Sequence, residues 1–164
     1  MNITEVIKNE YIVTNLKETV RDRVINELLS IESIQANVTD KEAVFHELLT
    51  REESFTTKIM DFVAIPHAKS DHVKQAMVLI GKSIEGIDWR AEPDFESSKP
   101  EERVKLIFMI LVPGQNEGNE HLKILAMLAR CLASDQFREN LINEMDATKL
   151  HQLVVGEVAA KMGK

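Results

Sequence analysis

Apolar residues form three short continuous runs in the middle of the chain. Two of them, Val73–Ile80 and Val104–Val112, have the length of strands and few polar interruptions, which is typical of strands covered by helices on both faces. The third, Phe62–Ile65, is followed by Pro66, whose missing N–H and fixed φ end regular ladder pairing. These runs predict two central strands and a third strand that delivers His67 to the rim of the sheet.

The first third of the chain has the spacing of helices. A short apolar burst at Tyr11–Val13 predicts a strand, and Thr19–Ile31 then carries apolar residues at helical spacing. Thr39–Glu42 reads as a capping box, in which the threonine hydroxyl and the glutamate satisfy each other's backbone donors. It predicts the start of a second helix, whose apolar stripe runs out at Thr50–Glu53. Further on, Ile84–Trp89 fits an edge segment, and the charged stretch 90–103, which contains two prolines, predicts a surface loop.

The last third of the chain is predicted to be helical. Leu122–Leu132 has a dense apolar face with Asn119 or Asn116 as its N-cap, and Ser134 and Asp146 are N-cap residues for two further helices. This order of elements predicts an α/β fold: a three-layer sandwich with a mixed sheet of about five strands and helices on both faces. No internal repeat or linker divides residues 1–164, so we expect a single domain.

Composition and charge narrow the class of protein. The 164 residues, 44% of them hydrophobic and 29% charged, suit a globular chain with one real core. A net charge of −7 without a basic cluster argues against nucleic acid as a partner. The longest apolar run, Leu106–Pro113, is far shorter than the roughly 20 residues of a membrane-spanning helix. The single cysteine, Cys131, and a start without a secretory signal indicate a cytoplasmic protein.

Three residues are candidates for chemistry. His67 follows an apolar strand and a proline, at a sheet rim where α/β proteins place their sites. His121 is expected in the first turn of a helix, whose N–H groups and dipole attract anions. Arg51, at the end of a helix, has a planar fork of donors that suits phosphate oxygens. A phosphoryl group would fit between the two imidazoles, although each residue alone is also compatible with a purely structural role.

The neighbourhoods of these residues resemble the fructose and mannitol type of IIA protein, the type 2 family of the bacterial sugar phosphotransferase system. The matching residues are Leu48–Glu53, Thr57, Val63–His67 and His121–Ala129, with the family's spacing between Arg51 and His67. The resemblance extends from about Tyr11 to Val155, and the combination of these motifs is specific.

The resemblance implies a concrete role. His67 would accept a phosphoryl group from the phosphohistidine of the carrier protein HPr and pass it to a IIB component for sugar uptake. His121 and Arg51 match the family's accessory residues beside the phosphorylated ring. No metal or cofactor is required if arginine and helix N–H donors carry the charge. Met60 and Phe62 depart from the family, which commonly has glycine and a small residue there, and we expect both side chains at the rim of the docking surface for HPr.

Two other functions stay open. The same phosphohistidine could serve a regulatory module that controls a partner protein instead of sugar transport, as in the nitrogen-related members of the resembling family. A metal hydrolase using His67, His72 and His121 is a weaker alternative, because the sequence has no histidine pair at i, i+4 and no accompanying carboxylate motif. The segment Gly114–Gly118 is interpreted as a flexible turn before the His121 helix, since it lacks the lysine of a P-loop.

Overall fold

The centre of the protein is one mixed β-sheet. The structure is a computed structural model that describes residues 2–115 and 119–163. The sheet has five strands in the order β1-β4-β5-β2, with β3 also paired to β5. Only β4 and β5 are antiparallel to each other, and the other pairs are parallel. The strands are β1 (Ile12–Val13), β2 (Val63–Ala64), β3 (His67–Ser70), β4 (Met77–Asp88) and β5 (Arg103–Pro113).

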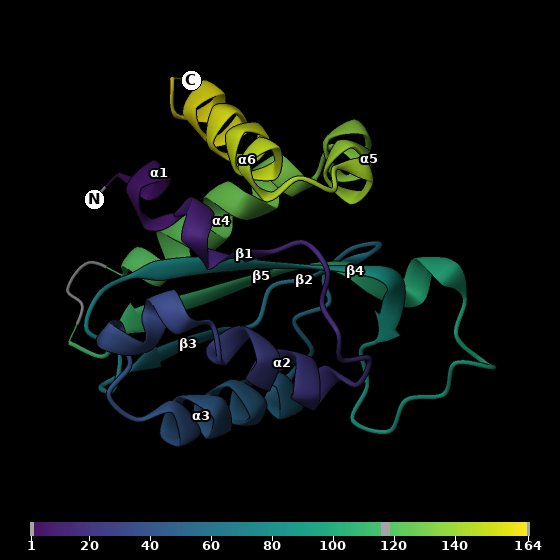
Figure 1. Cartoon of the computed structure of the whole chain (residues 1–164), viewed down its shortest axis with the longest axis horizontal. Coiled ribbons are helices and arrows are strands. Elements are labelled where there is room, and N and C mark those ends of the chain that lie inside the picture. The colour runs from purple at the N-terminus through teal and green to yellow at the C-terminus, as the bar shows by residue number, and fades with distance from the viewer. Residues whose placement is uncertain (1, 116–118, 164) are drawn as a thin grey trace.

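Helices cover both faces of this sheet (Figure 1). One face carries α2 (Arg21–Leu29) and α3 (Lys41–Ser54), and the other carries α1 (Ile3–Val6), α4 (Glu120–Leu132), α5 (Asp135–Asn143) and α6 (Ala147–Met162). Three short 3₁₀ helices complete the fold: Asn9–Tyr11, Glu32–Asn37 and Pro100–Glu102. The predicted three-layer α/β sandwich with a mixed sheet is therefore confirmed.

The two central strands explain why the apolar runs are continuous. Along β5, Ile107 and Met109 belong to the core under α2 and α3, whereas Phe108 and Ile110 belong to the core under α4 and α6. The side chains of a strand alternate between the two faces. Because both faces are covered, β5 is wholly apolar from Leu106 to Val112, whereas β4 buries two polar residues, Lys82 and Ser83, where its register on β5 shifts.

Strand β4 departs from the prediction at both ends. It begins at Met77, because Val73 makes only an isolated bridge to Val38. It also continues through the predicted edge segment, since Ile87 and Asp88 pair with β5 after a register shift that follows Lys82. The structure therefore has one long, bulged strand where we expected a central strand and a separate edge segment. The stretch 90–102 is a loop as predicted, apart from its 3₁₀ turn, and Arg103 already begins β5.

The helix caps are partly as predicted. Ser134 and Asp146 cap α5 and α6 with their side chains, which confirms both. The Thr39 capping box is wrong: the cap of α3 is Asp40, whose carboxylate accepts from the N–H of Ala43 at 3.0 Å. Thr39 is held outside the helix by its N–H, which donates to the carbonyl of His72. A tertiary contact therefore overrides the local signal.

Pro66 interrupts the edge strand without ending it, which corrects the expectation for His67. The register of β2 on β5 continues unchanged into β3, from Ala64↔Ile107 to His67↔Ile110. Although Pro66 has no N–H, its carbonyl still accepts from the N–H of Ile110 at 3.0 Å. His67 is therefore a member of the sheet and is not freed from ladder pairing.

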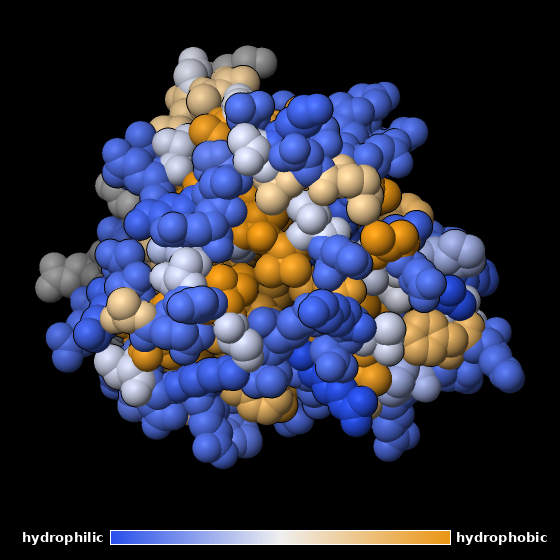
Figure 2. Space-filling view, in the orientation of Figure 1, coloured by the Kyte–Doolittle hydropathy of each residue, from blue (hydrophilic) through white to orange (hydrophobic). Residues whose placement is uncertain are grey.

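The surface agrees with this layering. In the view of Figure 1, polar and charged residues cover the outer helices, and an apolar area shows between the helix layers around β1 (Figure 2). Ile12 and Val13 of this edge strand are half-buried. Among the helices in the described ranges, none has the length and apolar character needed to cross a membrane.

Candidate functional site

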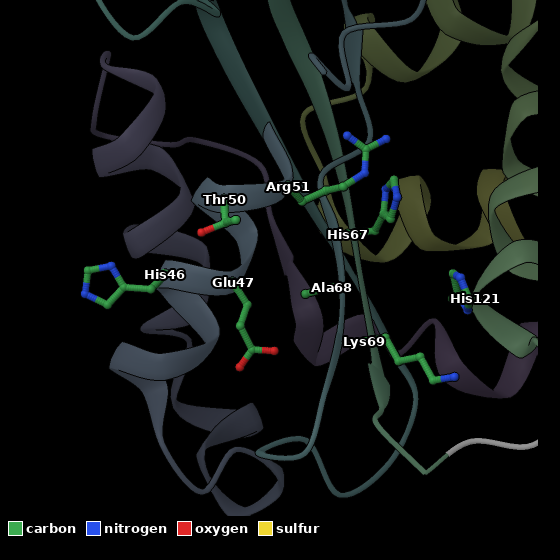
Figure 3. A pocket seen from close by; sticks show the side chains of 8 residues that line it. All are labelled: His46, Glu47, Thr50, Arg51, His67, Ala68, Lys69 and His121. Carbon is green, nitrogen blue, oxygen red and sulfur yellow. The ribbon is translucent and has the colours of Figure 1, made fainter. Parts of the chain in front are cut away.

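The three predicted site residues lie around one cavity. It has a volume of about 530 Å³ and receives Arg51 from α3, His67 from β3 and His121 from α4 (Figure 3). Its other lining residues are His46, Glu47, Thr50, Ala68 and Lys69. The sheet edge formed by β2 and β3 thus brings together residues from both helix layers.

The ring of His67 is oriented by its own strand. Its Nδ1 lies 2.9 Å from the carbonyl oxygen of Ile65. A carbonyl oxygen can only accept a hydrogen bond, so Nδ1 carries the proton and the lone pair is on Nε2. Ile65 lies just before Pro66, where the strand is interrupted. The break in the ladder thereby places a backbone carbonyl beside the imidazole and selects one tautomer.

The surroundings of His67 favour its neutral form. Burial lowers the pKa of His67, and the positive charge of Arg51 lowers it as well. The hydrogen bond to the carbonyl of Ile65 and the negative charge of Glu52 act in the opposite direction. Since the net shift is downward, the ring is neutral at pH 7 and its Nε2 is available as a nucleophile.

His121 lies in the first turn of α4, as predicted. The pKa of His121 is lowered mainly by burial, and electrostatic repulsion from His67 and Lys69 lowers it further. Asn119 occupies the N-cap position with a left-handed backbone (φ 53°), but its side chain makes no capping hydrogen bond. Its carbonyl instead accepts from the N–H groups of Leu122 and Lys123. The alternative cap Asn116 and most of the predicted turn 114–118 lie outside the described residues.

Arg51 reaches the cavity from the opposite helix layer. It lies in the last turn of α3, and its guanidinium group lies beside the ring of His67 (Figure 3). One nitrogen, Nη1, donates to the carbonyl oxygen of Phe55 at 2.7 Å and so holds the side chain in this direction. An arginine has five N–H donors, so others are left for an anion bound near His67.

Other lining residues were not predicted as part of the site. Lys69 is exposed and follows His67 by two positions, so that it lies on the same face of β3. Glu47 is tied to the sheet, because its carboxylate accepts from the hydroxyl of Ser70 at 2.9 Å. His46 lines the outer part of the cavity, but its ring points away from His67 (Figure 3). The spacing of two positions between His67 and Lys69 is the signal in the sequence from which this further cation at the site could have been predicted.

A second, more apolar hollow adjoins the first. It has a volume of about 330 Å³ and shares Arg51 and His67 with the first cavity. Ile59 and Leu122 line it and are each half exposed, at 50%. The nearby Phe55, whose carbonyl holds Arg51, is 73% exposed. The rim around His67 therefore combines cations with exposed apolar side chains, a pattern of protein-binding surfaces.

Comparison with known proteins identifies the family. The family described as "Phosphoenolpyruvate-dependent sugar phosphotransferase system, EIIA 2" matches residues 5–155. The chain belongs to this EIIA 2 family. It is also 38% identical over 138 residues to the "PTS system fructose-specific EIIA component" of Haloferax volcanii, covering 84% of each chain. Several other relatives are longer, and the chain spans only 12–21% of their length.

Solved structures of EIIA proteins have the same fold. The nitrogen regulatory protein IIA-Ntr from Neisseria meningitidis aligns with a TM-score of 0.78 and 28% identity, over 92% of this chain and 97% of that one. A complex of enzyme IIAMTL with phosphorylated enzyme IIBMTL from Escherichia coli aligns with a TM-score of 0.70. At 19% identity, over 92% of this chain and 99% of that one, this second likeness concerns the fold alone.

The two bulky residues that depart from the EIIA pattern do not line the cavity. Met60 packs against the core under α4 and α6, and Phe62 precedes β2 with its ring under the ammonium group of Lys105. Neither side chain lines either of the two hollows around His67. Their place at the rim of a docking surface for HPr stays a prediction. Phe62 has a φ of 69°, a left-handed conformation that suits glycine and strains an aromatic residue.

The remaining candidates for chemistry are a metal site and the cysteine. Within the described residues, no group of three histidine, cysteine or acidic side chains is placed to hold a metal ion. Cys131 is buried in α4, and burial raises the pKa of its thiol. A buried thiol of raised pKa is a poor nucleophile at neutral pH, so Cys131 contributes packing to the core.

Proposed function

We propose that this EIIA protein carries phosphoryl groups on His67 between phosphorylated HPr and a IIB component. The observation that carries the proposal is the hydrogen bond from Nδ1 of His67 to the carbonyl of Ile65. It leaves Nε2, with its lone pair, free to attack phosphorus. In the transfer, the P–N bond of the donor phosphohistidine breaks while a bond forms between phosphorus and Nε2 of His67.

Arg51 and His121 are the residues that stabilise the transferred group in this proposal. Phosphoryl transfer depends mainly on positioning and on compensation of the charge on the three peripheral oxygens. The guanidinium of Arg51 supplies a fixed positive charge beside the ring. His121 supplies a ring nitrogen at the N-terminus of a thirteen-residue helix, where the helix dipole favours an anion. These three residues would therefore share one phosphoryl group.

A protein partner fits the surface around His67. The exposed side chains of Ile59 and Leu122 line the apolar hollow next to the reacting ring, and the exposed Phe55 is bound to Arg51 through its carbonyl. They offer contact area to a partner without blocking the more polar cavity. Membership of the EIIA 2 family, together with a solved complex in which an enzyme IIAMTL of the same fold binds phosphorylated enzyme IIBMTL, supports a IIB component as one of these partners.

A regulatory role is the second candidate. It is supported by the likeness to the nitrogen regulatory protein IIA-Ntr, at 28% identity over nearly the whole of both chains. The two roles differ in the acceptor of the phosphoryl group. Label that moves from the phosphorylated chain to a fructose-type IIB component favours sugar uptake. Label that stays on the chain, together with phosphorylation-dependent binding of another protein, favours regulation.

The proposed carrier function is tested by phosphorylation in vitro. The chain is incubated with phosphoenolpyruvate, enzyme I and HPr, and its intact mass is measured under alkaline conditions, where phosphohistidine survives. We expect the mass of one added phosphoryl group on the wild type and none on His67→Ala. His72→Ala is the matched control, because His72 lies outside both hollows. Equal labelling of wild type and His67→Ala would refute the assignment of His67.

A further inference from the structure

Glu52 is a carboxylate in the interior of the protein. It follows Arg51 on α3, yet its side chain points into the core and is only 4% exposed. Val44 and Leu48, eight and four positions earlier, are fully buried on the same face of the helix. Glu52 thus extends the buried face of α3 into the stretch Thr50–Glu53, where the apolar stripe was expected to end. A carboxylate in such a position is unfavourable unless hydrogen bonds compensate its charge.

Four hydrogen bonds hold this carboxylate. Thr57 donates twice, from its N–H at 2.9 Å and from its hydroxyl at 2.6 Å. The hydroxyl of Thr56 donates at 2.9 Å, and the indole Nε1–H of Trp89 at 2.6 Å. All four donors are neutral, and within residues 2–115 and 119–163 no ion pair involves Glu52. The carboxylate therefore keeps its negative charge uncancelled while it ties the end of β4 to the segment after α3.

A chain of hydrogen bonds leads from Glu52 to the proposed phosphoryl acceptor. The carbonyl of Thr57 accepts from the N–H of Ile65 at 3.0 Å. The carbonyl of Ile65 in turn accepts from Nδ1 of His67 at 2.9 Å. The position of the ring thus depends on a backbone segment that Glu52 fixes. The charge of Glu52 also acts on the ring directly, because it raises the pKa of His67 against the larger effect of burial.

We propose that Glu52 is a positioning residue for phosphoryl transfer, which holds the ring of His67 with Nε2 toward the cavity and stabilises the charge that the ring acquires. This inference rests on the proposed carrier function. When Nε2 of His67 bonds to phosphorus, the ring keeps its Nδ1 proton and becomes a cation. The donor ring takes the electron pair of the broken P–N bond. A buried negative charge that acts on the acceptor ring favours this product and the transition state that leads to it.

Other charged groups also face His67. They come from every element that borders the cavity: Glu47 and Arg51 from α3, Lys69 from β3 and His121 from α4. His46 of α3 also lines the cavity, but its ring points away from His67 (Figure 3). Arg51 and Lys69 disfavour a cationic ring by their charge, and His121 does so when it is protonated. Glu47 is engaged with Ser70 at the other end of β3. Glu52 is therefore the negative group whose removal should be felt most strongly at the ring.

The test compares Glu52→Gln with Glu53→Gln, its exposed neighbour on the same helix. Glutamine keeps the size of the side chain and removes the charge. We expect kcat for transfer from phosphorylated HPr to fall roughly tenfold in Glu52→Gln, with little change in KM, because the buried carboxylate touches no partner. Nuclear magnetic resonance should show the ring of His67 titrating at lower pH and losing its pure Nδ1–H tautomer. Glu53→Gln should match the wild type in each measurement.

Two further variants keep the test decisive. Glu52→Asp restores the charge and should return the titration of His67 toward that of the wild type. Thr57→Val removes the hydroxyl hydrogen bond to Glu52 but keeps the carboxylate and the backbone hydrogen bonds of residue 57. It should lower kcat severalfold without moving the titration, and it can be measured even if Glu52→Gln does not fold. Wild-type kcat, tautomer and titration in a folded Glu52→Gln, or wild-type kcat in Thr57→Val, would overturn the inference. If phosphorylated HPr does not label the wild-type chain, the carrier function is overturned instead. The tautomer and the titration of His67 then still test whether Glu52 positions the ring.

Discussion

His67 and His121 line the same cavity but are held in different ways. His67 is part of a strand, its Nδ1 is bound by a backbone carbonyl, and its tautomer is thereby decided. His121 lies in the first turn of a helix, and its buried Nδ1 has no hydrogen-bond partner within the described residues. A nucleophile must present one defined lone pair, whereas a residue that binds phosphate oxygens can adjust its ring. The difference supports His67 as the acceptor and His121 as its assistant.

The largest expected effect that separates the two roles concerns transfer rates. His121→Ala and Arg51→Ala should each slow phosphorylation by roughly tenfold to a hundredfold without abolishing it, because a hydrogen bond to a charged group contributes about 1.5–3 kcal/mol. The measurement is the single-turnover rate with phosphorylated HPr, and circular dichroism checks that both variants are folded. Wild-type rates in both variants would show that neither residue assists the reaction.

A smaller effect is expected in the dependence of stability on pH. The pKa values of His67 and His121 are lowered in the folded chain. As the pH falls through 6.5, the two rings are therefore protonated in the unfolded chain before they are protonated in the folded chain. The free energy of unfolding should therefore decrease below pH 6.5 and stop decreasing, as far as these rings are concerned, below their folded pKa values. Urea unfolding at a series of pH values should show a shallower decrease for His67→Gln/His121→Gln. An unchanged slope would mean that burial does not disfavour the charged rings.

The main lines of the fold could be predicted from the sequence because local patterns and tertiary structure agree there. The continuous apolar runs of β4 and β5 reflect burial on both faces, and Ser134 and Asp146 cap their helices with contacts inside one turn. Where contacts distant in sequence decide, local patterns mislead. Thr39 is drawn away from its helix by the carbonyl of His72, which lies 33 positions later.

The candidate site shows the same division. Three candidate residues could be found because each lies at the end of a helix or beside a break in a strand, where functional residues are common: Arg51, His67 and His121. Glu52 was missed since a carboxylate after an apolar stripe is normally taken as its exposed end. Its position four residues after Leu48 was the available signal. Its partner Trp89, whose Nε1 donates to it, could not be inferred from spacing, because the two are 37 positions apart.

The smallest predicted effect concerns the other end of the edge strand that carries His67. Phe62 has a left-handed backbone conformation, which costs a residue with a Cβ atom about 1–2 kcal/mol relative to glycine. Phe62→Gly should therefore be more stable than Phe62→Ala by about 1 kcal/mol in urea unfolding. Both variants should be phosphorylated at the wild-type rate per folded molecule. If the rate of phosphorylation changes severalfold in both variants, Phe62 belongs to the docking surface for HPr, as expected from the sequence.

The central claim is that the sheet presents Nε2 of His67 as the phosphoryl acceptor. It is tested most directly by nuclear magnetic resonance of the chain with ¹⁵N-labelled histidine, recorded after phosphorylation by phosphorylated HPr. We predict coupling between phosphorus and Nε2 of His67, with Nδ1 still bearing its proton toward the carbonyl of Ile65. Phosphorus bonded to Nδ1 of His67, or to either nitrogen of His121, would contradict the account.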